Sequence, residues 1–275
     1  MGKIDSNTLS RHILISAVSL TNMLGEMYRK GLELKRMTKA AALLSMMGYL
    51  SPSAFSSIQN KCVETQYPDG GWVAVVDAMW NLAFLQRFNP SGCAENIRNG
   101  YAYLESNTSG EIWGRSKRDF ARIPVTGTML YLHPNLASGA RLQALERLWL
   151  SERNSLTYKA AYTLMAFSRN SYEPESKNII KETVSWLASN QRPDGSFAPW
   201  KDHPVASDTY CTAIALLGLL SYPELVQDDV SVSAAQWLLD TQLKSGVWPC
   251  HEIDDGSAWA AYALFCFRQH QAASL

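Results

Sequence analysis

The segment Gln191-Arg-Pro-Asp-Gly-Ser-Phe197 contains the pattern that decides the fold, because the pattern recurs. The same spacing, Gln-x-x-x-Gly-x-aromatic, is found in Gln66-Tyr-Pro-Asp-Gly-Gly-Trp72 and in Gln242-Leu-Lys-Ser-Gly-Val-Trp248. A degenerate copy covers residues 106–113. The glycines of neighbouring copies lie roughly 40 to 50 residues apart, a period typical of helical repeat arrays. One longer gap spans about two periods, which predicts a further turn without its glycine at residues 151–155.

The segments between these turns have apolar residues at positions i, i+3, i+4 and i+7, the spacing of one helix face. Amphipathic segments alternate with more uniformly apolar ones, which predicts an outer helix and then a buried inner helix in each repeat. The predicted outer helices cover residues 54–64, 94–104, 137–148, 176–188 and 230–239. The predicted inner helices cover residues 75–85, 125–132, 156–167, 210–220 and 257–267. Residues 8–28 and 38–50 supply a sixth pair.

Six such hairpins close a double ring, so the sequence predicts an all-α fold, an (α/α)6 barrel, in a single domain over residues 1–275. Residues 1–50 are expected to form either the first hairpin or a lid. All inner helices of such a ring run in the same direction, and their N-termini meet at one end of the barrel. That end carries partial positive charge and free N–H groups, and it is where a pocket is expected.

The composition narrows the class of function. Lys and Arg number 25 and Asp and Glu number 25, so no basic field for nucleic acid is expected. Five cysteines are an odd number, which favours reduced thiols and a cytoplasmic protein. The apolar runs are shorter than the ~18 residues that a membrane span needs, while peripheral membrane contact stays open.

The repeated turns resemble the QW motifs of triterpene cyclases. The alternating hairpins are similar to the (α/α)6 barrel shared by squalene-hopene cyclases, the β-domain of class II diterpene cyclases and the β subunits of protein prenyltransferases. The resemblance covers residues 66–267 and implies the toroid fold of this superfamily with an isoprenoid ligand. It also implies that a second element closes the pocket, either residues 1–50 as a lid or a second copy in a homodimer.

An acidic patch follows the last of the repeated turns. Class II cyclases carry an Asp-x-Asp-Asp motif whose middle Asp protonates an alkene or epoxide, and Glu252-Ile-Asp-Asp255 is similar to it. Two adjacent carboxyl groups can share a proton, because two close like charges do not both ionise cheaply. Capping of the following helix by acids is the equally weighted alternative. The resemblance implies Asp254 as proton donor, tuned or reloaded by Asp255, Glu252 and His251, while a second alignment on Asp208-Thr-Tyr-Cys-Thr-Ala213 offers Asp208.

A carbocation requires aromatic faces, and a diphosphate requires cations. Aromatic residues near the predicted inner-helix starts are candidates for a substrate-lining wall, although aromatics on helices are also common in cores. Residues 115–122 contain four cations before an inner helix and could hold a diphosphate, together with Mg²⁺. Pairing with Asp119 on a solvated loop is the alternative. The substrate-binding candidates are Tyr210, Trp80, Tyr158, Tyr162, Trp259, Arg118 and Arg122.

Zinc is the principal rival to acid catalysis. Protein prenyltransferase β subunits bind zinc through Asp, Cys and His, and lanthipeptide cyclases use two Cys and a His with a Cys-His pair similar to Cys250-His251. The spacing Asp208-x-x-Cys211 departs from the Asp-x-Cys of the prenyltransferases, and Glu252 replaces a glycine of the lanthipeptide cyclases. Such a site would activate a thiolate nucleophile. The ligands would be Asp208, Cys211, Cys250 and His251, with His203 near them.

Taken with the resemblance, the sequence predicts an atypical single-domain class II-like terpene cyclase. Protonation would start the cyclisation of a prenyl chain or a prenylated intermediate, and no metal would be required. The alternatives are a zinc-dependent enzyme that alkylates or cyclises thiols, and a barrel that binds a hydrophobic ligand without transforming it.

Overall fold

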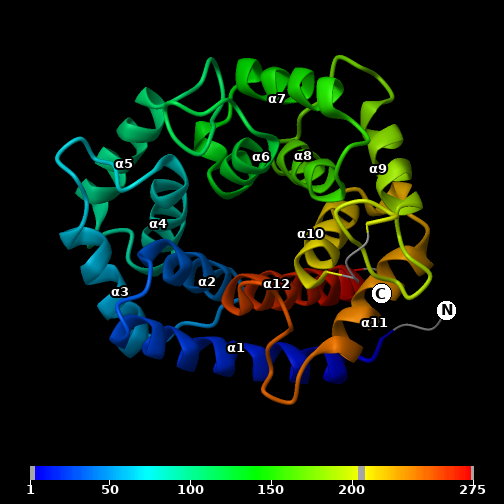
Figure 1. The fold of residues 1–275 in the computed structure, drawn as a ribbon, viewed down its shortest axis with the longest axis horizontal. Helices are drawn as coiled ribbons and strands as arrows, with labels where there is room; N and C mark the ends of the chain where they lie inside the picture. The colour runs from blue at the N-terminus through cyan, green and yellow to red at the C-terminus, as the bar shows by residue number, and fades with distance from the viewer. Residues whose placement is uncertain (1–3, 204–207, 274–275) are drawn as a thin grey trace.

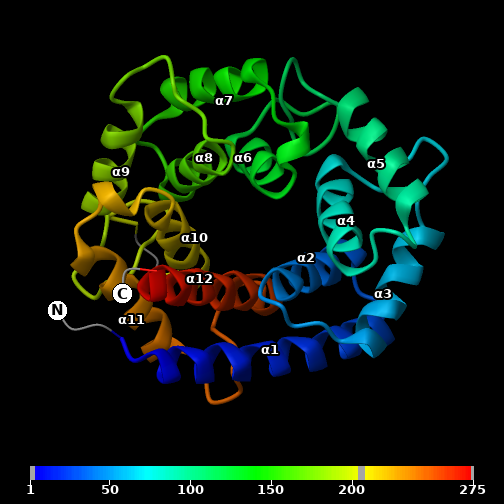
Figure 2. The ribbon, with the colours of Figure 1, turned by 180° about the vertical axis from the view of Figure 1, so that it is seen from behind.

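The fold is a closed ring of helical hairpins, with one layer of helices around another (Figures 1 and 2). The computed structural model describes residues 4–203 and 208–273, and every regular element in these ranges is helical. The outer helices are α1 (Ser6–Arg29), α3 (Pro52–Glu64), α5 (Ala94–Ser106), α7 (Gly139–Glu152), α9 (Ile179–Ser189) and α11 (Asp228–Thr241). The inner helices are α2 (Leu34–Met46), α4 (Val75–Phe88), α6 (Ile123–Leu132), α8 (Thr157–Arg169), α10 (Thr209–Leu220) and α12 (Ile253–Ala273). Two short 3₁₀ helices, η1 (Pro134–Leu136) and η2 (Pro223–Leu225), lie in connections.

Inner and outer helices differ in burial as their sequences predict. On α10 every side chain from Thr209 to Leu219 except that of Tyr210 is buried, whereas α5 buries only Gly100 and Leu104. The inner helices bury most of their side chains and therefore form the core. Burial of this apolar surface stabilises the fold by ~25 cal/mol per Å². The arrangement confirms the predicted all-α barrel.

The turn that lacks a glycine lies where the repeat period predicts it. Helix α7 ends at Glu152 and α8 begins at Thr157. Between them Asn154 has a φ of 60°, the left-handed conformation that glycine provides in the other turns. Asn tolerates this conformation better than most residues, so the turn survives without glycine.

The glutamine of each repeated turn links two neighbouring hairpins. The Gln66 side-chain amide donates to the Gly70 carbonyl at 2.8 Å and to the Asn96 carbonyl of α5 at 2.9 Å. Each glutamine therefore ties its own turn to the next outer helix around the ring. The equivalent acceptors are Gly195 and Val230 for Gln191, and Gly246 and His12 for Gln242.

The glycine and the aromatic residue of these turns each have a separate role. Gly195 has a φ of 91°, and a Cβ atom there would lie 2.5 Å from the Ser233 carbonyl oxygen. Glycine is thus required both for the backbone conformation and for the close approach to α11. The Trp248 indole N–H donates to the Leu238 carbonyl at 2.6 Å and so satisfies an acceptor at the end of α11.

The first and last hairpins meet to close the ring (Figure 1). The amide of Gln242 bonds His12 on α1, and the Ser19 hydroxyl donates to the Ser245 carbonyl at 2.6 Å. Helices α1 and α2 occupy the outer and inner positions of the first hairpin, which is one of the two roles expected for residues 1–50. Across the described ranges, the helices are too short or too polar to cross a membrane.

Candidate active site

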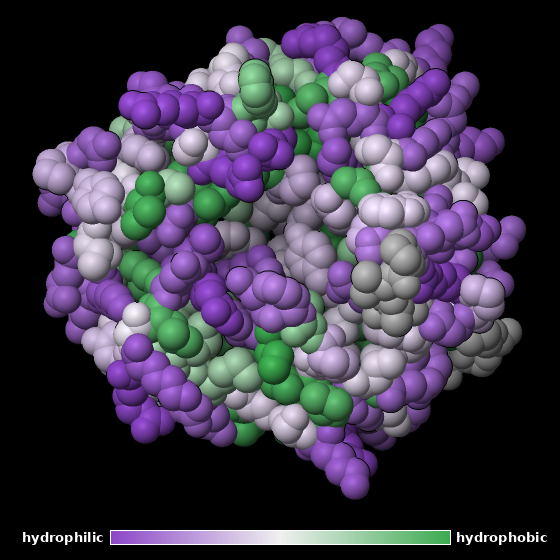
Figure 3. All heavy atoms as spheres, in the orientation of Figure 1, coloured by the Kyte–Doolittle hydropathy of each residue, from purple (hydrophilic) through white to green (hydrophobic). Residues whose placement is uncertain are grey.

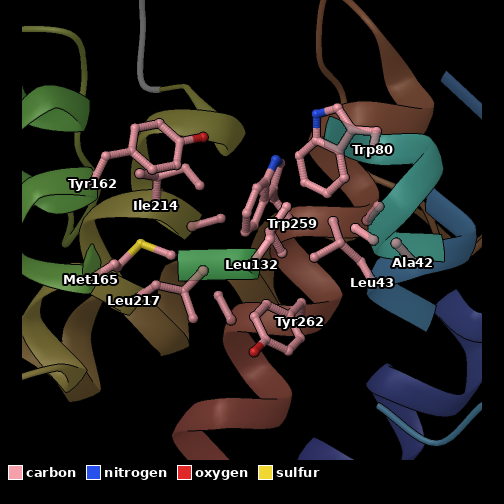
Figure 4. Close-up of a cluster of buried hydrophobic side chains, with 14 of the residues drawn as sticks. Ala42, Leu43, Trp80, Leu132, Tyr162, Met165, Ile214, Leu217, Trp259 and Tyr262 are labelled. Carbon is pink, nitrogen blue, oxygen red and sulfur yellow. The ribbon is translucent and has the colours of Figure 1, made fainter. Parts of the chain in front are cut away.

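Aromatic side chains from three inner helices meet inside the barrel (Figure 4). Trp259 of α12 lies between Trp80 of α4 and Tyr162 of α8, with ring centroids 5.8 and 6.2 Å away in edge-to-face geometry. Tyr262, one turn further along α12, is 6.2 Å from Trp259. The Trp259 Nε1 atom is buried and has no hydrogen-bond partner among the described residues. We call Trp80, Tyr162, Tyr210, Trp259 and Tyr262 the aromatic cluster.

A cation already lies against these rings. The Lys39 ammonium of α2 is 5.3 Å from the Trp80 centroid, 5.8 Å from that of Tyr210 and 6.0 Å from that of Trp259. These distances are within the range of cation–π attraction. The hydroxyl groups of Tyr210 and Tyr162 hydrogen-bond each other at 2.6 Å, which fixes both rings. The faces of the aromatic cluster are therefore oriented to stabilise positive charge.

The two carboxylates of the acidic patch are each paired with a different cation. Arg36 of α2 donates from Nε to Asp254 Oδ2 at 3.1 Å and from a second nitrogen to Oδ1. Lys39 approaches Asp255 Oδ1 at 2.5 Å. These two pairs hold α12 against α2. The proton shared by Asp254 and Asp255 stays a prediction from the sequence.

The two residues expected to tune this acid lie outside the barrel interior. His251 and Glu252 are exposed, and the Glu252 backbone carbonyl accepts from the Gly256 N–H. His251 lines a shallow pocket of about 300 Å³ together with Arg36 and Asp254. No hydrogen bond from the His251 or Glu252 side chain to Asp254 is found in the described part of the chain. The structure thus gives the Asp254 carboxylate a guanidinium partner instead.

Asp208 and two cysteines lie close together at the starts of α10 and α12. Asp208 caps α10 by accepting from the Tyr210 N–H at 2.8 Å, and the Cys211 sulfur lies 3.7 Å from its other oxygen. Burial raises the pKa of the Cys211 thiol well above its ordinary value, and that of the Cys250 thiol as well. Within residues 4–203 and 208–273 there is no group of three or more His, Cys, Asp or Glu side chains that could hold a metal ion.

Two of the four cations predicted to hold a diphosphate, Arg115 and Arg122, pair with Asp119 of their own loop. Asp119 accepts from Arg122 Nε at 2.6 Å and from Arg115 Nε at 3.1 Å, and its hydrogen bond with Arg122 lowers the Asp119 pKa strongly. Arg118 and Arg122 are both exposed. This is the alternative in which Asp119 pairs with the cations on a solvated loop. Neither Arg118 nor Arg122 lines the pocket described next, so the structure does not bring them to the aromatic cluster.

A pocket of about 730 Å³ opens between the starts of α2 and α4. This volume lies within the range of small-molecule sites. Its charged lining comprises three acids and two bases, an excess of negative charge that does not favour a diphosphate. Asn81 lines the pocket and follows Trp80 of the aromatic cluster, so pocket and cluster are neighbours on α4. The charged residues are Glu33, Glu64, Asp77, Lys35 and Arg115.

Asp77 is a pocket residue that the sequence analysis did not single out. It is half-buried in the first turn of α4, three residues before Trp80. Burial raises its pKa above the ordinary value, and Glu33 raises it further, while Lys35 opposes the shift. The available signal was the one acid in a mainly apolar segment, residues 75–85. Tyr158 of α8, a predicted substrate contact, is only partly buried, and burial also raises its pKa.

Solved structures with the same fold include terpene cyclases. A type II terpene cyclase, MstE from Scytonema, in complex with geranylgeranyl dihydroxybenzoate (substrate), superposes with a TM-score of 0.74 at 16% identity, over 96% of this chain and 98% of that chain. The ent-copalyl diphosphate synthase from Streptomyces platensis has a TM-score of 0.52 at 13% identity, over 84% of this chain and 49% of that chain. A possible GH105 family member from Klebsiella pneumoniae has a TM-score of 0.63 at 12% identity, over 98% and 95%.

These similarities show that the chain has the helical barrel fold of class II-type terpene cyclases. The possible GH105 member has the same fold, so the fold is compatible with more than one chemistry. No family model and no curated protein matches the sequence. The function must therefore be argued from the site.

Proposed function

We propose that this protein is a class II-like terpene cyclase that starts cyclisation of a prenyl chain by protonating a carbon–carbon double bond. The observation that carries the proposal is the placement of Asp77 in the pocket, one helical turn before Trp80 of the aromatic cluster. A proton donor and a wall for the resulting cation are the two parts that this chemistry needs. The substrate-bound structure of MstE, a type II terpene cyclase with the same fold, also supports the proposal.

In this mechanism the Asp77 carboxyl O–H donates its proton to the terminal alkene. The raised pKa supports this role, because more of the group is protonated near neutral pH than for an exposed aspartate. The tertiary cation is attacked by the next double bond, which forms a carbon–carbon bond and moves the charge along the chain. The last cation loses a proton to water, and the Asp77 carboxylate recovers one from solvent. The product is an isomer of the substrate.

The aromatic cluster would lie along the path of the charge. Trp80, Trp259 and Tyr210 already face the Lys39 ammonium, and Tyr162 and Tyr262 extend the wall deeper into the barrel. Aromatic faces stabilise a cation without capturing it, whereas water would end the reaction early. Asp254 and Asp255 are assigned a supporting role, since their ion pairs position Lys39 and α2.

The test is incubation of the protein with geranylgeranyl dihydroxybenzoate and with simpler prenyl phenols, followed by chromatography and mass spectrometry. A new compound of unchanged mass, absent with Asp77→Asn, is expected. The control is Asp69→Asn, an acid in the turn before α4 that does not line the pocket. If wild type leaves all these substrates unchanged while binding them, the barrel is a carrier, which is the second candidate because its interior is apolar.

A further inference from the structure

Two arginines lie near the ends of inner helices, each seven positions after a member of the aromatic cluster. On α4 Arg87 follows Trp80, and on α8 Arg169 follows Tyr162. Figure 4 shows Trp80 and Tyr162 pointing into the barrel. Residues seven positions apart in a helix share a face. Arg87 and Arg169 therefore lie on the inner faces of their helices, about 10 Å further along the helix axes.

The groups around Arg87 agree with this placement. Arg87 is half-buried, and burial lowers its pKa below the ordinary value of arginine. The nearby phenol groups of Tyr262, Tyr101 and Tyr131 oppose this shift, whereas Arg169 adds to it. Tyr262 belongs to the aromatic cluster, so the guanidinium group of Arg87 lies next to the far end of that cluster.

Arg87 has no carboxylate partner among the described residues. Its one hydrogen bond in this part of the chain goes from a terminal nitrogen to the Ala83 carbonyl of its own helix, at 2.9 Å. A guanidinium group has several N–H donors, so most of them are available to a ligand. Arg36 and Lys39 of α2 also lie at the inner ring, and each pairs with a carboxylate of α12. Arg87 thus carries an uncompensated charge in a half-buried position.

The connections at this end of the barrel supply few acids. The connections 47–51, 89–93 and 133–138 contain no Asp or Glu. The acids of the remaining two connections from an inner to an outer helix are Glu173, Glu175 and Glu224. None of these acids is among the strongest influences on the pKa of Arg87. The helix dipole favours a cation in the last turn of α4, but it does not explain why this cation is withdrawn from water without a counter-charge.

An apolar wall leads from the aromatic cluster toward Arg87. Its side chains in Figure 4 are those of Leu132, Met165 and Leu217. Figure 3 shows a hollow near the centre of the face that it presents, on the axis around which the inner helices stand. Asp77 and Arg87 are ten positions apart on α4, which is about 15 Å along the helix axis. A chain of several isoprene units along this wall would place one end near each of these residues.

We propose that Arg87 binds the carboxylate head of an amphiphilic ligand whose prenyl chain lies along the aromatic cluster toward Asp77. A guanidinium group binds a carboxylate through paired, parallel N–H bonds. The inference rests on the proposed function for the identity of the chain, and it adds the class of the substrate, a prenyl compound with an acidic head.

Neighbouring groups support a single carboxylate at this position. The hydroxyl groups of Tyr131 and Tyr262 are 2.6 Å apart, and burial raises the pKa of both, so they stay neutral and can donate hydrogen bonds. The exposed Arg169 adds a second positive charge that attracts an anion. A diphosphate carries more negative charge than two arginines balance, so a carboxylate is the better match.

The test compares the binding of geranylgeranoic acid and of geranylgeraniol, which has the same chain and an uncharged head, by isothermal titration calorimetry. We expect wild type to bind the acid about 10- to 100-fold more tightly, because hydrogen bonds between charged groups are the strong ones. Arg87→Gln should lose this preference and keep its affinity for the alcohol. Arg87→Lys keeps the charge without the planar fork and should retain part of the preference. Arg29→Gln, in the last turn of the outer helix α1, is the matched control and should keep all of it.

Four results would overturn the proposal. Wild type could bind neither ligand or bind both equally, Arg87→Gln could keep the preference for the acid, or Arg29→Gln could lose as much of it as Arg87→Gln. The comparison of the two ligands on wild type needs no variant, so it stands even if a variant does not fold. Turnover separates this inference from the proposed function. Cyclisation of neutral prenyl compounds without a preference for the acid would overturn the inference alone, and a preference for the acid without turnover would overturn the cyclase function alone.

Discussion

Two inner helices of this barrel begin with acids, and the two starts have opposite surroundings. Helix α12 begins with Asp254 and Asp255, which are matched by Arg36 and Lys39 of α2. Helix α4 begins with Asp77, which lines a pocket and whose pKa is raised by burial. The α12 acids are the ones that resemble a catalytic motif, yet their cations make them suited to closing the ring. The barrel therefore holds two candidate proton donors in different surroundings, one engaged in ion pairs and one lining a pocket.

The largest expected effect is on turnover after Asp77→Asn. General acid catalysis contributes about 10²- to 10⁴-fold, so cyclisation should fall by that factor while prenyl ligand binding persists. Asp254→Asn should keep the rate of cyclisation within about tenfold of that of wild type. Product formation followed by mass spectrometry checks both. A reversed ranking, with Asp254→Asn inactive and Asp77→Asn active, would return the acid role to α12.

The pH dependence should follow the protonation of Asp77. Its pKa is raised by burial, and the acid form is the reactive one, so the rate should fall as pH rises through that raised pKa. Above it the rate should drop about tenfold for each pH unit. The charged groups that face Asp77 are Lys35 and Glu33, and Lys35→Gln should move the profile to higher pH by removing a cation. A profile that is flat across the acidic and neutral range would exclude a titrating carboxyl donor.

The aromatic cluster should contribute less than the acid. Trp259→Leu removes the central ring, and the cation–π contribution of ~1 to 2 kcal/mol corresponds to a rate loss of about 5- to 30-fold. Trp259→Phe keeps an aromatic face and should restore part of the rate. Trp149→Leu, a buried tryptophan of α7 outside the cluster, is the matched control for lost core volume. Equal rate losses in the Trp149 and Trp259 variants would assign the ring a packing role alone.

The smallest expected effect is on thermal stability, which should change differently when Asp254 and Asp77 are substituted. Asp254→Ala leaves Arg36 without its partner and should destabilise the fold by ~2 kcal/mol, which lowers Tm by several degrees. Asp77→Asn should leave Tm unchanged or raise it at neutral pH. The sign follows because the folded-state pKa of Asp77 is raised, so ionisation costs stability as pH rises through that value. Thermal unfolding of the two variants at neutral and acidic pH measures both.

The fold could be predicted from the sequence because its signals are local. A helix face repeats within a few residues, and a Gln-x-x-x-Gly-x-aromatic turn is complete in seven positions. Even the turn near Asn154 follows from the period, since the chain length between glycines leaves room for another hairpin. The predicted helix ranges therefore agree closely with α3 through α11. Helix α12 extends beyond the predicted 257–267 at both ends, and α2 lies four residues before the predicted 38–50.

The site could be predicted only in part, because partners come from distant positions. Asp254 and Arg36 are 218 positions apart, so the sequence around Asp254 does not indicate that a guanidinium group pairs with it. Trp80, Tyr162, Tyr210 and Trp259 do lie together inside the barrel, as their positions near inner-helix starts led us to expect, while their contact with substrate stays a prediction. Asp77 was missed because it carries no motif and only its burial in the folded protein raises its pKa.

The most direct test of protonation by Asp77 is turnover in heavy water. Wild type, Asp77→Asn and Asp254→Asn would be incubated in D₂O with geranylgeranyl dihydroxybenzoate and the other prenyl phenols, and the products would be examined by mass spectrometry and NMR. We expect one deuterium on carbon at the site of protonation for wild type and Asp254→Asn, and no product for Asp77→Asn. A cyclised product without carbon-bound deuterium, or one formed equally by Asp77→Asn, would contradict it.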